Sequence, residues 1–353
     1  MPGLRRAQRK RRAGVGREAG IDPVCHTLVG AGLARSGLGS RTALGTATLL
    51  IGANLPDIDV LAYLGGPAAD LELRRGWTHG VPALVVLPFL LTGGMLLFDR
   101  TVRRAGRASL PSRVVPRQLL VLAAVAIVSH PLLDTLNTYG VRWLMPFSGR
   151  WFYGDTLFIV DPWVWLALAG GLLLRSARGG LLLALGYVLV LAISGVAARI
   201  LATGELTRLS GEPVRSLMVS PVLANPFVRT VVAAQNGSYR VAIFRWLERP
   251  HLDPRSVQVF PRDRPDHPAV EAAAATTLAR RFLGWARFPV FQIEPGSGTA
   301  GSYHVHLVDL RYANRPGVTF GSVTIPVVIQ PASGPRRGTP PASSPGVAGA
   351  RLP

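Results

Sequence analysis

Long apolar runs alternate with short polar segments through the first 200 residues of the chain. Four of these runs are long enough to cross a hydrocarbon core of about 30 Å, because an α-helix rises about 1.5 Å per residue. The pattern therefore predicts an all-α, polytopic membrane helical bundle. The four predicted spans are residues 81–98, 119–136, 158–174 and 181–200.

Two shorter apolar segments, residues 24–34 and 42–54, precede these runs. The segment that joins them contains Gly37 and Gly39, which suit a tight connection between helices. Both segments are short for a full span. We therefore expect an N-terminal helical hairpin that is either packed into the bundle or partly re-entrant.

The composition changes after about residue 200. Residues 228–234 and 239–246 are apolar and flank an Asn-Gly pair that is typical of a β-hairpin. Residues 201–330 are therefore predicted to form a small α+β extramembrane domain after the membrane domain, which covers residues 21–200. The other elements expected in it are a helix at 270–286 and strands at 290–294, 303–311 and 318–329.

Both ends of the chain differ from these two domains. Residues 1–20 are rich in Arg but lack the apolar region and cleavage site of a signal peptide. We interpret them as either a start-site extension or a tail that reshapes the first hairpin. Residues 331–353 are rich in Pro, Gly, Ser and Arg without an apolar period, which predicts disorder.

The composition favours a membrane protein and limits the other classes. Of 353 residues, 48% are hydrophobic and only 16% are charged, and the mean hydropathy is +0.30, which is too apolar for an ordinary soluble protein. The net charge of +20 comes from short basic clusters between apolar runs, so we expect membrane lipids and no nucleic acid as partners. A lone cysteine, Cys25, excludes an intrachain disulfide framework and a Cys-rich zinc site.

The basic clusters also predict an orientation, because Lys and Arg in short loops favour the cytoplasmic side. Arginines gather between residues 99 and 117, and Arg175 and Arg178 follow the third predicted span. Alternation then places residues 137–157, and everything after about residue 201, on the outer face. The N-terminal basic tail disagrees, because the same alternation leaves it outside.

Several groups of polar residues interrupt or border the apolar segments. Ionisable side chains at membrane depth are costly and need a reason. The predicted topology brings all of these groups toward the outer face, and this convergence is the main evidence for a shared polar site. The groups are His26, residues 56–59, residues 74–79, residues 129–134, Asp155 and Asp161.

The spacing within these groups suits a divalent cation. His130 and Asp134 lie one helical turn apart on one face, as a two-ligand clamp requires. Asp57 and Asp59 can direct one carboxylate to a metal ion and the other to a water or a histidine N–H. Zn²⁺ and Mn²⁺ suit such mixed ligands. The remaining candidate ligands are His26 and His79.

Each feature also has a structural interpretation. A single His near a helix end is more often a capping or interfacial residue, and Pro-Asp-x-Asp can simply start a turn or cap a helix. His130 and Asp134 can form a buried hydrogen-bonded pair or a proton relay. The rival to an enzyme is therefore a membrane transport or scaffold protein whose His/Asp cluster relays protons or stabilises the bundle.

Five segments then occur in a distinctive order: residues 22–31, 55–59, 75–80, 129–135 and 139–147. In that order they resemble the YdjM-like family of bacterial inner-membrane proteins, which carries the predicted label of metal-dependent hydrolase. The similarity covers about residues 21–250. The resemblance implies a metal site formed by His26, Asp57, Asp59, His79, His130 and Asp134.

One departure from the family concerns Arg74, where the family often has a His. If that His is a ligand, the site of this chain is weakened or altered. The favoured function is metal-assisted hydrolysis at the membrane interface, in which a metal-activated water attacks an ester or phosphoester. Asp59 or Asp155 is expected to orient or deprotonate that water, and a lipid-derived substrate fits the location.

Overall fold

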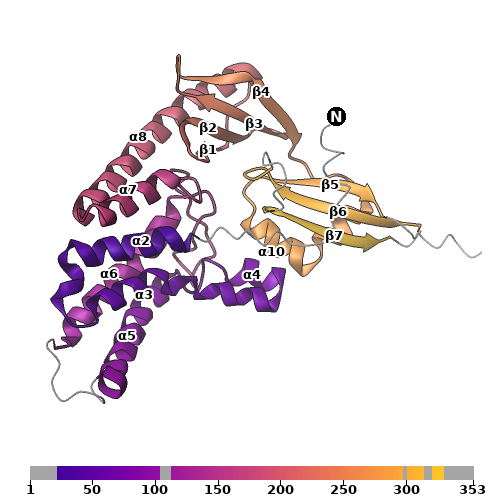
Figure 1. The fold of residues 1–353 in the computed structure, drawn as a ribbon. Helices are drawn as coiled ribbons and strands as arrows, with labels where there is room; N and C mark the ends of the chain where they lie inside the picture. The colour runs from indigo at the N-terminus through magenta and orange to yellow at the C-terminus, as the bar shows by residue number, and fades with distance from the viewer. Residues whose placement is uncertain (1–21, 104–112, 297–299, 314–319, 330–353) are drawn as a thin grey trace, which may run out of the picture.

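A computed structural model of the protein describes residues 22–103, 113–296, 300–313 and 320–329 (Figure 1). The described chain begins with a helical region and continues into a region that contains two antiparallel β-sheets. The two tails predicted from the sequence, residues 1–20 and 331–353, lie outside the described residues.

The first two apolar segments form the expected hairpin of packed helices. Helix α2 (Pro23–Leu33) begins at Asp22, whose side chain accepts a hydrogen bond of 2.9 Å from the backbone N–H of Cys25. Helix α3 (Gly45–Asn54) returns beside it, after a π-helical turn (Ala34–Leu38) and a 3-10 turn (Gly39–Arg41). The two helices pack tightly, because a Cβ atom at Gly30 would lie 2.9 Å from the carbonyl oxygen of Leu49.

Helix α3 continues directly into a long 3-10 helix, Leu55–Gly65, which carries Asp57 and Asp59. Pro56 stands in the first turn of this helix, where its missing N–H costs no intrahelical hydrogen bond. The chain then forms α4 and the helices of the bundle core. Their bounds are α4 (Pro67–Leu73), α5 (Val81–Phe98), a π-helical turn (Asp99–Arg103), α6 (Pro116–Thr135), α7 (Pro162–Leu173) and α8 (Ala177–Ser210).

Four helical segments of the described chain are long and apolar enough to cross a membrane, but they differ from the predicted four. The span predicted at residues 158–174 is wrong in length, because Asp161 caps α7 and leaves 12 residues, about 18 Å of helix. The segment predicted at residues 42–54 is longer in the structure, because the 3-10 helix Leu55–Gly65 extends α3 to the length of a membrane span. The four segments are Gly45–Gly65, Val81–Arg103, Pro116–Thr135 and Ala177–Ser210.

The predicted Asn-Gly hairpin is confirmed. Strands β2 and β3 pair antiparallel, and Ala234 and Tyr239 form the last pair before the turn. The sequence patterns missed β1 and β4, which flank the hairpin in a four-stranded antiparallel sheet of order β1-β2-β3-β4. The strands are β1 (Ser216–Val222), β2 (Asn225–Ala234), β3 (Ser238–Arg245) and β4 (His251–Pro261).

The second sheet has three antiparallel strands, β5 (Pro289–Pro295), β6 (Ser302–Asp309) and β7 (Ser322–Val328). The single helix predicted at residues 270–286 is divided into α9 (Pro268–Ala274) and α10 (Thr277–Trp285). The break occurs at Thr276, whose hydroxyl accepts a hydrogen bond from the backbone N–H of Ala279 and so caps α10.

Both sheets are anchored on the helical region. The first sheet packs on the C-terminal part of α8, where Ala198, Ala202 and Leu206 are completely buried against it. The second sheet and α10 share a core with Tyr139 from the segment that follows α6. Helix α8 therefore extends beyond the length of about 20 residues that a membrane span needs, and its end serves as a platform for the first sheet.

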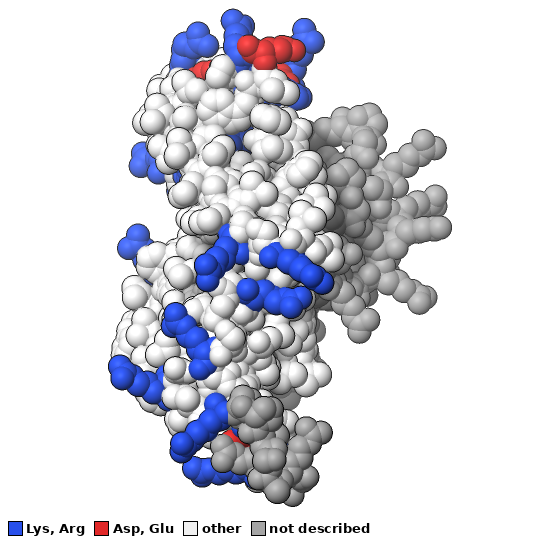
Figure 2. Space-filling view, turned by 60° about the vertical axis from the view of Figure 1, so that its left-hand side comes forward, with Lys and Arg blue, Asp and Glu red and all other residues white. Residues whose placement is uncertain are grey.

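The basic turns of the helical region gather at one end of the bundle. Arg178 at the start of α8 donates to the carbonyl of Ser36, and the backbone of Ala43 donates to Arg113 before α6. Figure 2 brings this side of the molecule forward, and many basic side chains and few acidic ones lie on it between broad uncharged areas. The candidate site residues lie toward the other ends of the same helices.

Candidate metal centre

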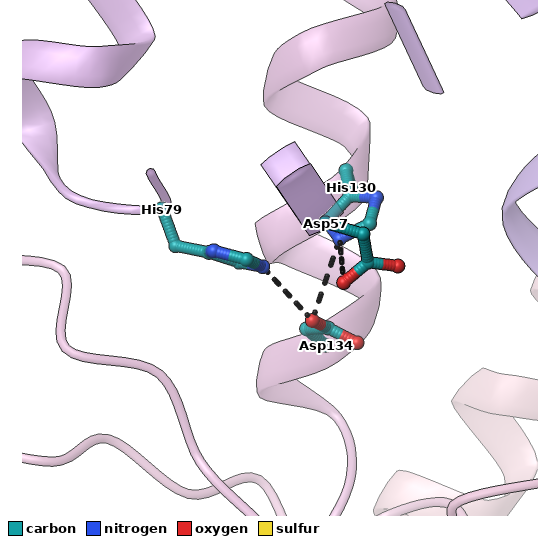
Figure 3. Close-up of side chains that lie close together, drawn as sticks. All are labelled: Asp57, His79, His130 and Asp134. Carbon is teal, nitrogen blue, oxygen red and sulfur yellow. Dashed lines mark ion pairs between the residues drawn. The ribbon is translucent and has the colours of Figure 1, made fainter. Parts of the chain in front are cut away.

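Four of the candidate ligands converge inside the helical region. One ligand atom from each of Asp57, His79, His130 and Asp134 lies within 4.8 Å of the others. Figure 3 shows His130 and Asp134 on successive turns of α6, with His79 and Asp57 reaching them from separate segments. We call this set the His/Asp cluster. The sequence prediction that these four residues come together agrees with this geometry.

The histidines of the cluster are held so that the Nε2 atom faces inward. His130 Nδ1 lies 2.7 Å from the carbonyl oxygen of Ala53, and a carbonyl only accepts, so Nδ1 carries the proton. His79 Nδ1 lies 2.9 Å from the Thr78 hydroxyl and 3.4 Å from Asp59 Oδ2. In a neutral imidazole this arrangement leaves Nε2 with a free lone pair, as a metal ligand requires.

The inward atoms crowd together without hydrogen-bond donors. Asp134 Oδ2 lies 3.3 Å from His79 Nε2 and 3.5 Å from His130 Nε2, and Asp57 Oδ1 lies 3.5 Å from His130 Nε2. Both Nε2 atoms and Asp134 Oδ2 are buried without a hydrogen-bond partner among the described residues. Buried polar atoms are normally satisfied. A cation among them would satisfy all three, so the residues present fit a metal ion.

The charge of the site supports the same conclusion. Asp57, Asp59 and Asp134 supply three carboxylates, and the Arg75 guanidinium pairs with one of them, at 2.8 Å from Asp134 Oδ1. With neutral histidines, this pair leaves the carboxylates of Asp59, which is buried, and of Asp57, which is partly buried. An unpaired buried charge is costly. A divalent cation would neutralise this pair of charges.

His26 lies beside the four-residue set and not within it. Its ring stacks on that of His130, with 3.7 Å between the ring centroids, and its Nε2 lies 3.5 Å from Asp134 Oδ1. A cleft lined by His26, Asp134 and Asn137 leads to this side of the cluster. His26 therefore lies between the cleft and the His/Asp cluster.

Asp59 supports the cluster from outside. Its Oδ2 accepts hydrogen bonds from the backbone N–H of Arg75, at 2.7 Å, and from the Thr78 hydroxyl, at 3.1 Å. The same oxygen lies near His79 Nδ1. Asp59 thus fixes the turn that presents His79, while its other oxygen, Oδ1, has no partner among the described residues.

Asp155, the other predicted catalytic residue, is directed elsewhere. Its carboxylate accepts from Arg199 at 2.5 Å and from Arg287 at 2.9 Å, and none of its described contacts reaches the His/Asp cluster. Asp161 caps α7 by accepting from the backbone N–H groups of Trp163 and Val164. Both carboxylates therefore have structural partners in this protein.

Arg74 does not occupy a ligand position either. Its guanidinium donates to the Tyr63 hydroxyl, at 2.9 Å, and lies 3.4 Å from Asp70. The next residue, Arg75, is the one that enters the cluster. The presence of Arg where the resembling family often has His therefore leaves the four converging ligands in place.

Three contributors to the site were missed by the sequence patterns. They are Arg75, which pairs with Asp134, Thr78, which contacts both Asp59 and His79, and the carbonyl of Ala53, which fixes His130. Arg75 and Thr78 lie in the same polar stretch as His79. Their nearness in the sequence to this candidate ligand was the one feature that could have indicated a role in the site. A backbone carbonyl leaves no trace in the sequence.

Comparisons with known proteins agree with this assignment of a membrane helical region. The family model described as YdjM inner membrane protein matches residues 21–203, just over half of the chain and all of the cluster. The chain is also similar to the uncharacterized protein YfhP of Bacillus subtilis (strain 168), with 22% identity over 81% of this chain and 84% of that protein. No solved structure matches. The chain belongs to the YdjM inner membrane protein family.

Proposed function

We propose that this protein is a membrane-bound, metal-dependent hydrolase that acts on an ester or phosphoester at the membrane interface. The observation that carries the proposal is the convergence of unpartnered, buried ligand atoms from His79, His130 and Asp134. Asp57, His79, His130 and Asp134 would hold zinc or manganese. A bound ion of this kind lowers the pKa of a water and polarises a substrate oxygen.

The surrounding residues have separate roles in this proposal. Asp59 holds the His79 ring and keeps its Nδ1 protonated, and its free Oδ1 is the candidate acceptor for a proton from the attacking water. Arg75 holds Asp134 in place. Asp155, with both oxygens engaged by arginines, is a poorer candidate for the base. A lipid-derived substrate fits a site that opens beside membrane helices.

The test begins with metal content in full-length protein purified in mild detergent. We expect at least one tightly held ion in the wild type after reconstitution with zinc or manganese. His130→Ala and Asp134→Ala should each lower the affinity by on the order of 10–100-fold, whereas His304→Ala, on β6, should not. The absence of bound metal in the wild type would sink the proposal.

Activity separates the enzyme from its rival. Metal-loaded protein should release p-nitrophenol from p-nitrophenyl esters or phosphoesters, and the release should stop when a chelator removes the ion. In the rival account, the histidines are protonated and neutralise the carboxylates, so that the cluster is a proton relay or a structural network. The absence of both metal binding and hydrolysis would favour that account, whereas tight metal binding without hydrolysis would contradict both accounts and indicate a structural metal site.

We further propose that the cluster and both sheets face the extracytoplasmic side of the inner membrane. The basic turns at the opposite end of the bundle support this orientation, because basic residues in short turns favour the cytoplasmic side. A reporter fused after Arg107 should be active only in the cytoplasm, and one fused after Gly211 only outside. The reversed pair of results would place the cluster on the cytoplasmic face.

A further inference from the structure

A second cleft lies between the helical region and the second sheet, separate from the His/Asp cluster. Helices α4 and α10 approach each other there, as Figure 1 shows. The walls are mainly aromatic and aliphatic, and they carry one guanidinium and one carboxylate. The side chains that matter here are Tyr63, Asp70, Arg74, Tyr139, Phe282 and Trp285.

Two residues that line this cleft have buried N–H donors without an acceptor. Arg74 is 2% exposed and Trp285 is 3% exposed. Arg74 Nη2 and Trp285 Nε1 have no hydrogen-bond partner among the described residues. An unsatisfied buried donor costs about 1–3 kcal/mol. Two of them in one cleft indicate that a bound molecule supplies the acceptors.

The charges around Arg74 favour an anionic molecule. Arg142 is also buried and donates to the carbonyl oxygens of Glu72 and Arg74, but it forms no ion pair with a described residue. Burial accordingly lowers the pKa of the Arg142 guanidinium. Asp70, 3.4 Å from Arg74, is the carboxylate that pairs with that guanidinium. Arg74 Nη2 nevertheless stays a charged donor without a hydrogen-bond partner among the described residues, and charged donors bind anionic acceptors most strongly.

We propose that this cleft binds an organic oxyanion, a phosphate or carboxylate group on an apolar or aromatic body. Arg74 and Trp285 donate to the oxyanion, and the rings of Tyr63, Tyr139 and Phe282 contact the body of the molecule. The site is distinct from the His/Asp cluster and needs no metal. The chemistry is shared by a lipid headgroup and by a soluble phosphate ester.

The cleft is connected to the His/Asp cluster through a single ring. Tyr139 lines the cleft, and the guanidinium of Arg75 lies 4.7 Å from the centre of its ring. Arg75 in turn donates to Asp134 at 2.8 Å. A molecule in the cleft would therefore contact the residue that supports the arginine of the cluster.

The experiment is isothermal titration calorimetry on the full chain in neutral detergent, after chelator treatment so that no metal ion binds phosphate. The probes are phenyl phosphate, dihexanoyl phosphatidic acid and, as the uncharged control, phenol. We expect saturable binding of at least one anion and much weaker binding of phenol. Binding of the lipid alone identifies a headgroup as the ligand, and binding of phenyl phosphate alone identifies a soluble ester.

Variants assign the binding to the cleft. Arg74→Gln should lower the affinity for the anion by about tenfold or more. Trp285→Phe, which keeps an aromatic ring, should lower it by about threefold. Arg280→Gln changes an exposed arginine on α10 and should have no effect. No saturable anion binding to folded wild type, or equal affinities in the Arg74 and Arg280 variants, overturns the proposal. If Arg74→Gln does not fold, an unchanged anion affinity in Trp285→Phe overturns the proposal instead.

Discussion

Two of the groups of buried charges among the described residues differ in whether their atoms have partners. In the His/Asp cluster, carboxylate oxygens and imidazole nitrogens face one another without donors. In the second group, which we call the arginine cluster, Asp155 and Asp309 accept from Arg199, Arg287 and Arg311, and none of these acceptor oxygens is unsatisfied. Burial of charge therefore does not by itself mark a functional site.

The sign of the charge differs as well. The His/Asp cluster together with its neighbours Asp59 and Arg75 has three carboxylates and one guanidinium, whereas the arginine cluster has two carboxylates and three guanidiniums. The arginine cluster joins α8, the segment after α6 and the second sheet, and Arg311 also donates to the carbonyl of Thr138 at 2.6 Å. It is complete as it stands and holds the regions together. The His/Asp cluster, in contrast, could hold a metal ion.

The largest expected effect is a loss of folding stability on substitution of Asp155 in the arginine cluster. Asp155→Asn should lower the free energy of unfolding by about 3 kcal/mol, because it removes a completely buried carboxylate and leaves two partly buried guanidiniums without a counter-charge. Arg199 is partly exposed and can reach water, which keeps the loss near the lower end of the usual range. Denaturant titration in detergent measures it.

Metal affinity should be unchanged in Asp155→Asn. As a control, Asp253→Asn removes the carboxylate of a solvent-accessible ion pair with Arg245, and it should change the free energy of unfolding by less than about 1 kcal/mol. Loss of metal from Asp155→Asn would instead return Asp155 to the site, as the sequence analysis expected.

The next effect concerns metal affinity. Asp134→Asn should weaken zinc or manganese binding on the order of 100-fold, because it removes the carboxylate that both histidines face. The amide oxygen can still accept from Arg75, so the helix and its neighbours stay in place. Competition with a metal indicator measures the change. A similar loss of metal from Asp309→Asn would show that the effect is general destabilisation.

Most of the His/Asp cluster was predictable, because its residues interrupt apolar runs where charge is costly. His130 and Asp134 share a helix face by spacing alone, and the topology brought Asp57 and His79 to the same end. The separation of His26 from the four-residue set was not predictable. It depends on the position of α2 relative to α6, which is set by the packing of the two helices.

The arginine cluster could not be predicted, because its partners are distant in sequence. Asp155 meets Arg199 and Arg287, which are 44 and 132 residues away. The same limit explains the errors in the fold. Residues 158–174 are apolar apart from Asp161, and the cap that this residue forms sets where α7 begins. Strands β1 and β4 are defined by their pairing with the hairpin, and the short apolar pattern of each one gave no clear period.

A smaller effect is expected outside the ligand set. Asp59→Asn should weaken metal binding by about tenfold, because it disturbs the orientation and the protonated Nδ1 of His79 while leaving all four ligands present. Equilibrium dialysis against zinc distinguishes this change from that of Asp134→Asn. An effect as large as that of Asp134→Asn would make Asp59 a ligand in its own right, as the family resemblance implies.

The smallest effect tests whether a single hydroxyl tunes the His/Asp cluster. Thr78 Oγ1 donates to Asp59 Oδ2 at 3.1 Å and lies 2.9 Å from His79 Nδ1, so it fixes both groups at once. Thr78→Val keeps the shape of the side chain and removes these hydrogen bonds, and metal affinity should fall by about threefold. Thr78→Ser keeps the hydroxyl and should bind metal as the wild type does. Equal losses in the Val and Ser variants would show that the effect does not come from the hydroxyl alone, because Val keeps the methyl group and Ser keeps the hydroxyl. An unchanged affinity in Thr78→Val with lowered stability would mean that this hydroxyl, like the arginine cluster, only holds the fold.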